Sequence, residues 1–332
     1  MTKRASTRLV SAIWAGLSGL ARGLARSGVL NVVDLSQEIY PAKRVVSVGN
    51  LQAGGAGKTP LVAQLAREAH EKGLSVCILI RGYGGSWEHT GGVIDSQDSL
   101  RHKAKPTAAE SGDEALLLSD LVPSAYIGVG ADRVRAYRMA CLEKGSGFDL
   151  VILDDGFQHW KIRKDLNIVA VTSGGPWSRV FRDSVSALKY ADLVVWTKGD
   201  TRPFYIDAFA KEQVRVRFQL QAPAEEKKRV WLVTGIADSE SARSSAARAG
   251  YQILKQISFP DHARYTSEDV DRILGQAKRE NNWIAVTGKD WVKWREFSAF
   301  AGPVSQPVVV LEPELVFEEG REVWLQKLWA NT

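Results

Sequence analysis

A glycine-rich segment that ends in Lys58 and Thr59 has the residue types that point most directly to chemistry. Its residues are Gly54, Gly55, Ala56, Gly57, Lys58 and Thr59. It lies between an apolar run at 45–48 and a stretch with helical periodicity at 61–71. Glycine backbones can close on phosphate oxygens, a helix N-terminus favours anions, and a Lys-Thr pair can reach the terminal phosphates and Mg²⁺. Gln52 stands where the standard pattern has glycine, so we expect the doubled glycine to wrap the phosphates of a nucleotide instead.

Carboxylates occur where a second buried strand is expected to end. The apolar run 149–153 leads into Asp154 and Asp155. An apolar strand that ends in aspartate is typical of nucleotide-binding folds in which the carboxylate holds Mg²⁺ or its water. Gln158 and His159 follow on the same rim and could contact a substrate. Together with the glycine-rich segment, these residues predict a nucleotide site that uses Mg²⁺.

Two further loops are expected on the same rim, because ligands of an open parallel sheet bind beyond the carboxyl ends of its strands. Arg81 and Tyr83 follow an expected strand at 75–80. The arginine could clamp a phosphate, or it could be solvated in a glycine-rich turn. Asp113 and Glu114 open an expected helix, where a carboxylate favours the helix N-terminus and could also act as a base. The residues alone leave these alternatives open.

The elements that position these residues alternate between strands and helices. Short apolar strands are expected at 126–129, 166–171 and 193–196, and a helix begins near Arg133. The last of these strands leads into Thr197-Lys198-Gly199-Asp200, which resembles the guanine-reading box of GTP-binding proteins. A P-loop GTPase that acts as a metal or cofactor chaperone is therefore an alternative function.

A second, smaller unit follows a stretch of prolines and charges between 203 and 229. Strands expected at 230–234, 283–287 and 308–311 alternate with helices, which predicts a small α/β layer. His262 lies in a polar loop of this unit. Its imidazole could face the nucleotide site and take part in proton transfer, although a single histidine is more often structural.

The first thirty residues form a basic segment that contains no acid. Its basic residues are Lys3, Arg4, Arg8, Arg22 and Arg26. Apolar residues recur at helical spacing at Ile13, Leu17, Leu20 and Leu24. A helix with an apolar stripe and basic flanks lies well on an anionic bilayer, so we predict a membrane-associated amphipathic helix. A packing helix and a secretory signal are the alternatives, and a cytosolic nucleotide argues against export.

Composition limits the class of protein. The chain has 332 residues, 45% hydrophobic and 25% charged, a globular profile long enough for two domains. Its net charge of +6 is too small to indicate nucleic acid, and it fits an anionic small molecule or membrane surface. Two cysteines cannot build a disulfide framework. No apolar run reaches the roughly 18 residues of a confident membrane span.

Taken together, these segments resemble the lipid A 4'-kinase family, the tetraacyldisaccharide 4'-kinases. The matching residues occur in the order typical of that family, from about 45 to 292: Val48-Gly49-Asn50, Gly54-Gly55-Ala56-Gly57-Lys58-Thr59-Pro60, Arg81-Gly82-Tyr83-Gly84, Gly112-Asp113-Glu114, Asp154-Asp155-Gly156-Phe157-Gln158-His159, Phe259-Pro260-Asp261-His262, and Thr287 with Lys289-Asp290. The resemblance implies a P-loop kinase core, a smaller α/β domain and an N-terminal membrane-associated helix.

The activity implied by the resemblance is phosphate transfer from ATP to the 4'-hydroxyl of a tetraacyldisaccharide 1-phosphate in lipid A (lipopolysaccharide) biosynthesis. The cellular location implied by the resemblance is the cytoplasmic face of the inner membrane. The catalytic aspartate and histidine of the family correspond to Asp113 and His262. Its nucleotide and Mg²⁺ residues correspond to Lys58, Thr59 and Asp155. Its headgroup contacts suggest Arg81, Tyr83, Arg133, Gln158 and His159.

Several positions depart from the usual pattern of the family. Ala263 stands where a second histidine is frequent, and Gly85 stands where an arginine is usual. Asp183 follows Arg182 where an Arg-Glu pair is usual, and the shorter acid argues against a metal role. If the resemblance holds, Ala263 shows that the second histidine is not essential to this chain.

We therefore predict an α/β fold with three parts. An N-terminal amphipathic membrane-associated helix covers 1–34, a P-loop NTPase-like parallel sheet core covers 35–222, and a smaller α/β domain covers 223–332. Besides the GTPase, a membrane protein that binds ATP without phosphorylating a substrate is an alternative.

Overall fold

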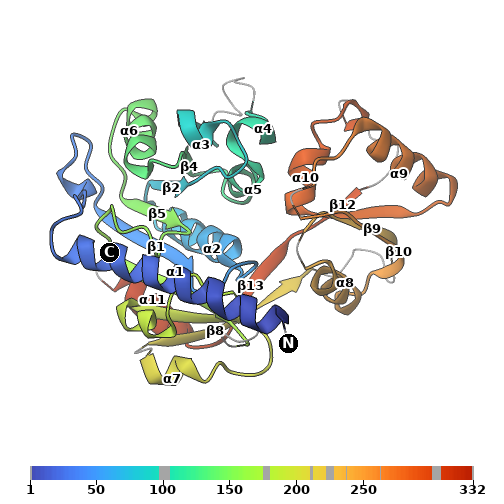
Figure 1. Cartoon of the computed structure of the whole chain (residues 1–332). Coiled ribbons are helices and arrows are strands. Elements are labelled where there is room, and N and C mark those ends of the chain that lie inside the picture. The colour runs from blue at the N-terminus through green and yellow to red at the C-terminus, as the bar shows by residue number, and fades with distance from the viewer. Residues whose placement is uncertain are drawn as a thin grey trace.

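Two β-sheets organise the molecule, a larger one that forms the core and a smaller one beside it (Figure 1). The structure is a computed structural model that describes residues 2–96, 105–174, 180–209, 212–221, 228–236, 238–261, 263–300 and 308–330. Both sheets are covered by helices, as the alternation of strands and helices in the sequence predicts.

The larger sheet is mainly parallel, with its strands in the order β13-β8-β7-β6-β1-β5-β2-β4-β3. Its strands are β1 (Arg44–Asn50), β2 (Val76–Ile80), β3 (Gly92–Asp95), β4 (Tyr126–Val129), β5 (Leu150–Asp154), β6 (Leu166–Thr172), β7 (Leu193–Lys198), β8 (Gln213–Leu220) and β13 (Pro313–Glu319). Neighbours from β8 to β4 pair in parallel, and β13 and β3 form antiparallel edges. The predicted P-loop NTPase-like sheet is confirmed, and the carboxyl ends of its parallel strands share one edge.

The central strands are apolar on both faces because helices cover both. On one face, Val46 and Ile152 pack among residues of α2 (Lys58–Glu71), α5 (Asp113–Leu121) and α11 (Arg321–Trp329). On the other face, Val151 packs against α6 (Arg133–Lys144). The remaining elements of the core are η1 (Leu35–Gln37), α3 (Trp87–Thr90), α4 (Ala108–Ser111), η3 (Val185–Tyr190) and α7 (Tyr205–Phe209).

A buried carboxylate fastens the C-terminal helix α11 to α2. Glu68 accepts hydrogen bonds from the indole Nε1 atoms of Trp324 at 2.8 Å and Trp329 at 2.9 Å. Arg321 supplies an ion pair at 2.5 Å, and Gln64 donates a fourth bond at 2.8 Å. Burial opposes the ionisation of Glu68, but these donors keep its pKa below the ordinary value. The helix that follows the nucleotide loop is thereby held to the end of the chain.

The smaller sheet is parallel and has the order β10-β9-β11-β12. Its strands are β9 (Arg229–Thr234), β10 (Gln252–Ser258), β11 (Trp283–Thr287) and β12 (Val308–Leu311), and its helices are α8 (Ser239–Arg248), α9 (Ser267–Arg279), α10 (Gly288–Trp294) and η4 (Ser298–Phe300). Trp231 and Trp294 are buried in its core, next to Val270 and Ile273 of α9. The smaller α/β layer expected from the sequence is present.

The end of the chain differs from the predicted division at 223–332. After β12 the chain leaves the smaller sheet, and β13 pairs antiparallel with β8 of the larger one, Phe317 opposite Val216. β13 and α11 thus belong structurally to the core. The physical reason is that Leu315 and Phe317, on one face of β13, cover the hydrophobic cluster at that edge. We propose a core that consists of 35–221 and 313–330.

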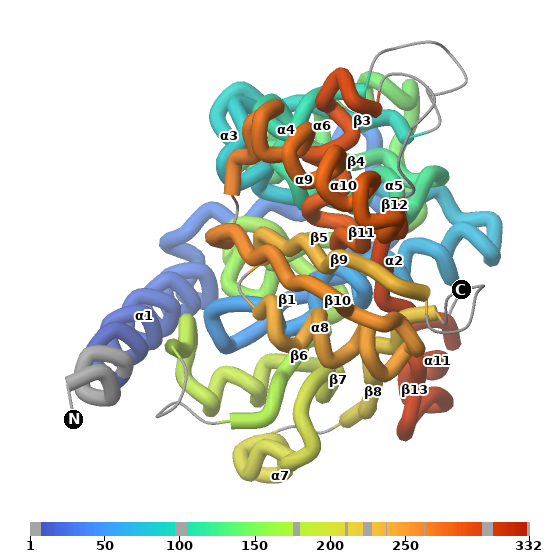
Figure 2. The backbone as a smooth tube through the Cα atoms, turned by 90° about the vertical axis from the view of Figure 1, so that its right-hand side faces the viewer, coloured from blue at the N-terminus to red at the C-terminus, as the bar shows by residue number. Residues whose placement is uncertain are grey.

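The N-terminal helix α1 (Thr2–Arg26) is laid along the core with its polar side inward. Ser11, Ser18 and Arg22 are buried, whereas Leu17 and Leu20 are 57% and 62% exposed. In Figure 2, α1 lies at the edge of the molecule, to one side of the strands of the larger sheet. Among the described residues, no helix combines the length and the apolar character needed to span a membrane.

Candidate active site

The nucleotide loop connects the end of β1 with the first residue of α2. Gly57 has φ +74°, and a Cβ atom there would lie 2.3 Å from the ring of Phe218, so this position requires glycine. The loop then delivers Lys58 and the N-terminus of α2 to the carboxyl edge of the sheet. The arrangement suits an anion such as a nucleotide phosphate.

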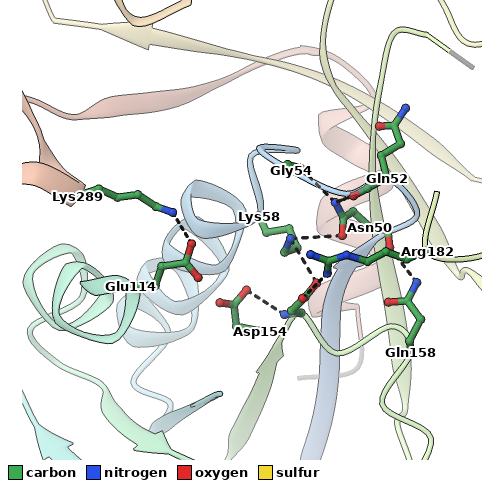
Figure 3. Close-up of polar contacts among 10 residues, drawn as sticks. Asn50, Gln52, Gly54, Lys58, Glu114, Asp154, Gln158, Arg182 and Lys289 are labelled. Atoms are coloured by element: carbon green, nitrogen blue, oxygen red, sulfur yellow. Dashed lines mark hydrogen bonds and ion pairs between the residues drawn. The ribbon is translucent and has the colours of Figure 1, made fainter. Parts of the chain in front are cut away.

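Lys58 lies between an amide at the end of β1 and a carboxylate that directly follows the neighbouring strand β5, and Figure 3 shows Lys58 next to the amide of Asn50. Its Nζ donates to Asn50 Oδ1 at 3.3 Å and is 3.3 Å from Asp155 Oδ1. Asp155 also receives an ion pair from Arg182 at 2.6 Å. Burial raises the pKa of Asp155, but Lys58 and Arg182 outweigh it and hold that pKa below the ordinary value.

Asp154 differs from its neighbour in both burial and charge. It is the last residue of β5 and only 3% exposed, and its Oδ1 accepts a hydrogen bond from the backbone N–H of Asp155 at 3.0 Å. Burial, with help from Glu114, raises the pKa of Asp154 to about 7, against the opposing effect of Lys58. Asp155 is therefore the better anionic ligand of the two.

The residues present fit a Mg²⁺ ion. Asp155 Oδ1 is a buried oxygen beside the nucleotide loop, and its neighbour there is the Lys58 ammonium at 3.3 Å. Thr59 lies in the first turn of α2, next to Lys58. Mg²⁺ in kinases is held by one or two protein oxygens together with phosphates and waters, so a hydroxyl and a carboxylate suffice.

Gln52 occupies the position that has glycine in the standard loop pattern, and it is almost completely buried. Its Oε1 accepts from the backbone N–H of Thr172 at 3.1 Å and from the hydroxyl of Thr172 at 2.7 Å. Its Nε2 donates to the carbonyl of Thr172 at 3.2 Å and to Tyr205 Oη at 3.3 Å. The side chain therefore fixes the start of the nucleotide loop to the end of β6.

The carboxylates at the start of α5 face basic residues of the smaller unit. Asp113 is 8% exposed, and its Oδ2 lies 3.8 Å from Lys293 Nζ of α10. Glu114 forms a short ion pair with Lys289, also from α10 (Figure 3). Burial lowers the pKa of Lys289, but Glu114 outweighs it and the net shift is upward. These contacts place α10 over the rim, and sequence reasoning missed Lys293 because no motif marks it.

His262 lies outside the described residues. Its neighbour Ala263 is described, and the carbonyl of Ala263 accepts a hydrogen bond from Lys293 Nζ at 3.2 Å. Because the same ammonium lies 3.8 Å from Asp113, the loop of the smaller unit comes close to the start of α5.

The expected headgroup residues surround this edge, with different exposure. The loop of Arg81 and Tyr83 packs directly against the junction of α4 and α5, because a Cβ atom at Gly85 would lie 2.5 Å from the carbonyl of Glu110 and 2.6 Å from the backbone N of Gly112. Tyr83 is 69% exposed, and Arg81 forms an ion pair with Glu88 at 2.7 Å. This loop is open to a substrate.

Arg133, Gln158 and His159 are more enclosed. Arg133 is buried and donates to the carbonyl of Gly130, and burial lowers its pKa to about 10. Gln158 Nε2 donates to the carbonyl of Asn50 at 2.9 Å. Burial and the charge of Arg133 lower the pKa of His159 to about 4, so its imidazole is neutral at pH 7.

Two other segments have structural roles. Thr197 Oγ1 donates to the carbonyl of Ala56 at 2.8 Å and thereby supports the nucleotide loop. Asp183 is 1% exposed and accepts hydrogen bonds from Ser18 and Arg22 of α1, so it holds that helix.

The chain is similar to several known proteins. The model of the family described as tetraacyldisaccharide-1-P 4'-kinase matches residues 5–330. A tetraacyldisaccharide 4'-kinase of Geobacter metallireducens is 35% identical over 298 residues, which cover 83% of each chain. That of Geobacter sulfurreducens is 32% identical over 326 residues, which cover 92% of this chain and 89% of the relative. The crystal structure of an "apo" form of LpxK from Aquifex aeolicus in complex with ATP has a TM-score of 0.72 and 25% identity, and covers 98% of each chain.

Proposed function

The chain belongs to the tetraacyldisaccharide 4'-kinase family, and on that premise we propose how its residues share the work of the reaction. The reaction is ATP-dependent phosphorylation of the 4'-hydroxyl of a tetraacyldisaccharide 1-phosphate in lipid A biosynthesis. A GTPase is not favoured. Two contacts at one edge of the sheet support this assignment of roles. Lys58 contacts Asp155 there, and Asp113 contacts Lys293 of α10.

The nucleotide loop and Lys58 bind the phosphates of ATP. Lys58 is already oriented by Asn50 and Asp155, so little reorganisation is needed when the γ-phosphate arrives. Thr59 and Asp155 are the residues that would hold Mg²⁺, which neutralises charge on the β- and γ-phosphates when bound. Arg182, now paired with Asp155, is close enough to add positive charge beside the phosphates.

Asp113 accepts the proton of the sugar hydroxyl. As the 4'-oxygen forms its bond to the γ-phosphorus, the bond from that phosphorus to the β–γ bridging oxygen breaks, and ADP leaves. Lys293 holds the Asp113 carboxylate from the side of the smaller unit. His262 corresponds to the histidine of the family and directly precedes Ala263 in the sequence, and we assign it the role of orienting Asp113. Positioning and charge stabilisation contribute most of the rate, since a sugar hydroxyl is a poor nucleophile.

The headgroup is held by residues of three loops around Asp113. Arg81 and Tyr83 are exposed on the loop that packs against α5 and can contact phosphate and sugar. Arg133, Gln158 and His159 form the deeper wall, in which neutral His159 can accept or donate a hydrogen bond.

The acyl chains remain in a lipid surface to which α1 docks. Exposed apolar side chains lie along the outer face of α1, at Leu9, Ile13, Trp14, Leu17 and Leu20. An apolar stripe of this length is unusual on a water-facing helix and suits the boundary of a bilayer. We place the protein at the cytoplasmic face of the inner membrane, where ATP is available.

The test of this function is transfer of the γ-phosphate from labelled ATP or GTP to tetraacyldisaccharide 1-phosphate in mixed micelles. The control acceptor carries hydrogen in place of the 4'-hydroxyl. We expect transfer from ATP to the intact acceptor and none to the control. Hydrolysis of GTP without an acceptor, together with an unlabelled lipid, would contradict the assignment.

A further inference from the structure

Arg22 is a basic residue of α1 that faces away from any lipid surface. The sequence groups it with the other basic residues of the first thirty, but it is only 9% exposed. Its Nη2 forms an ion pair with Asp183 Oδ2 at 2.5 Å, and Ser18 donates to the same oxygen at 2.6 Å. About two turns before Ser18 on the same face, Ser11 Oγ accepts from the backbone N–H of Phe181 at 2.9 Å. The polar face of α1 thus binds segment 181–183.

The segment held by α1 is joined directly to the nucleotide loop and to the metal carboxylate. The backbone N–H of Arg182 donates to the carbonyl of Leu51 at 2.6 Å, and Ala53 donates to the carbonyl of Val180 at 2.8 Å. The guanidinium of Arg182 binds Asp155 at 2.6 Å. The anchor of α1 at Asp183 is therefore the direct neighbour in the chain of Arg182, the residue whose side chain orients Asp155.

A second connection runs through an indole ring. The Arg22 guanidinium lies 5.2 Å from the centroid of Trp160, and the ammonium of Lys164 lies 4.6 Å from the same ring. Lys164 donates to the carbonyls of Gly156 at 3.1 Å and Phe157 at 3.0 Å, which follow Asp155 in the chain. Arg22 thus contacts both segments that determine where the Asp155 carboxylate lies.

We propose that Arg22 is a positioning residue for phosphoryl transfer: through Asp183 and Trp160 it fixes the two loops that orient Asp155, and it thereby couples the docked helix α1 to the nucleotide site. This inference rests on the proposed function. A buried arginine–carboxylate pair is weak evidence for stability, because desolvation offsets much of the attraction. The pair does impose a definite geometry, and misplacement by about 1 Å at a reacting centre can cost ~100-fold in rate.

The experiment compares Arg22→Met and Arg22→Lys with Arg321→Met. Arg321 is the matched control, because it also pairs with a buried carboxylate, Glu68, and lies 4.4 Å from the centroid of an aromatic ring, Phe317. It belongs to α11, away from α1 (Figure 2). In mixed micelles, kcat, KM for ATP and the Mg²⁺ concentration for half-maximal rate are measured at saturating lipid, and KM for the lipid is measured by varying the lipid. Thermal stability is measured on the same variants.

We expect Arg22→Met to lower kcat by about tenfold or more and to raise the Mg²⁺ requirement, with little change in KM for the lipid. Arg22→Lys, which keeps a cation for Asp183, recovers part of the loss. Arg321→Met loses comparable thermal stability and keeps kcat within about twofold of the wild type. A kcat for Arg22→Met within twofold of the wild type, or an equal fall for Arg321→Met, would overturn the inference.

Amide hydrogen exchange keeps the inference testable if Arg22→Met does not fold. In Arg22→Lys, the amides of Gly156 and Arg182, which donate to the carbonyls of Val48 and Leu51, should exchange faster than in the wild type, while those of β2 do not change. Unchanged exchange at Gly156 and Arg182 with a wild-type kcat contradicts the role of Arg22. Failure of the proposed function is seen separately, because the wild-type protein would then label no lipid.

Discussion

The exposed apolar face of α1 leads to a quantitative prediction for membrane binding. Leu17 and Leu20 are 57% and 62% exposed. Replacing a leucine with alanine removes three carbons, about 2.4 kcal/mol of transfer free energy for a side chain that moves completely out of water. Since about 60% of each side chain is available for burial, each substitution removes roughly 1.4 kcal/mol. The double variant Leu17→Ala/Leu20→Ala should therefore partition about 100-fold more weakly into anionic vesicles.

The assay is co-sedimentation with vesicles of stated anionic lipid content, followed by kinetics on vesicle-embedded acceptor. Alanine is as good a helix former as leucine, so α1 itself should persist. The matched control is Leu142→Ala/Leu325→Ala, two leucines that are 71% and 40% exposed on α6 and α11. The control should partition like the wild type. In the α1 variant the apparent KM for lipid should rise, while ATP binding and Tm stay unchanged.

Two results would refute the reasoning about α1. Unchanged partitioning of the Leu17→Ala/Leu20→Ala variant would show that this face does not enter the lipid surface. A fall in Tm of several degrees, with no change in partitioning, would show that the helix packs through these leucines, as the alternative of a packing helix requires.

Three further predictions concern the core. Gln52→Leu leaves the buried N–H and hydroxyl of Thr172 without their acceptor, so we expect a loss of about 1–3 kcal/mol in the free energy of unfolding, and KM for ATP several-fold higher with KM for lipid unchanged. The pKa of Glu68 is lowered in the folded state, so its carboxylate stabilises the folded protein above the ordinary pKa of 4.5, and this stabilisation is lost as the pH falls below it. Denaturant titrations at several pH values should show that the Glu68→Gln variant lacks this part of the acid sensitivity. Lys289→Met releases Glu114 beside the catalytic edge, so kcat should fall several-fold while calorimetry finds the same Kd for ATP.

The sheet and the nucleotide loop could be predicted because local signals and tertiary structure agree there. The apolar runs at 45–48 and 149–153 are buried on both faces, which is what a parallel strand between helices requires. A strand, a glycine-rich loop, Lys58 and a helix in this order indicate a phosphate-binding loop and few other structures. Gln52 could be singled out as a departure, but its role could not be predicted, since its partner Thr172 lies on another strand.

Long-range partners account for what the sequence could not show. β13 has a short apolar centre, Leu315-Val316-Phe317, next to glutamates, and nothing in that pattern specifies β8 as its neighbour. Arg22 is part of a basic segment that suits a lipid surface, yet its side chain is buried in an ion pair with Asp183, a residue far along the chain. Lys293 belongs to no motif and becomes relevant only because α10 packs over Asp113.

Single-turnover transfer by wild type and Asp113→Asn tests the central claim most directly. The asparagine keeps the shape of the side chain but cannot accept a proton. With ATP and lipid both saturating, and ATP binding measured on the same samples, we predict a rate lower by roughly 10²–10⁴-fold and an unchanged Kd for ATP. A single-turnover rate close to that of the wild type would contradict the assignment of Asp113 as the base.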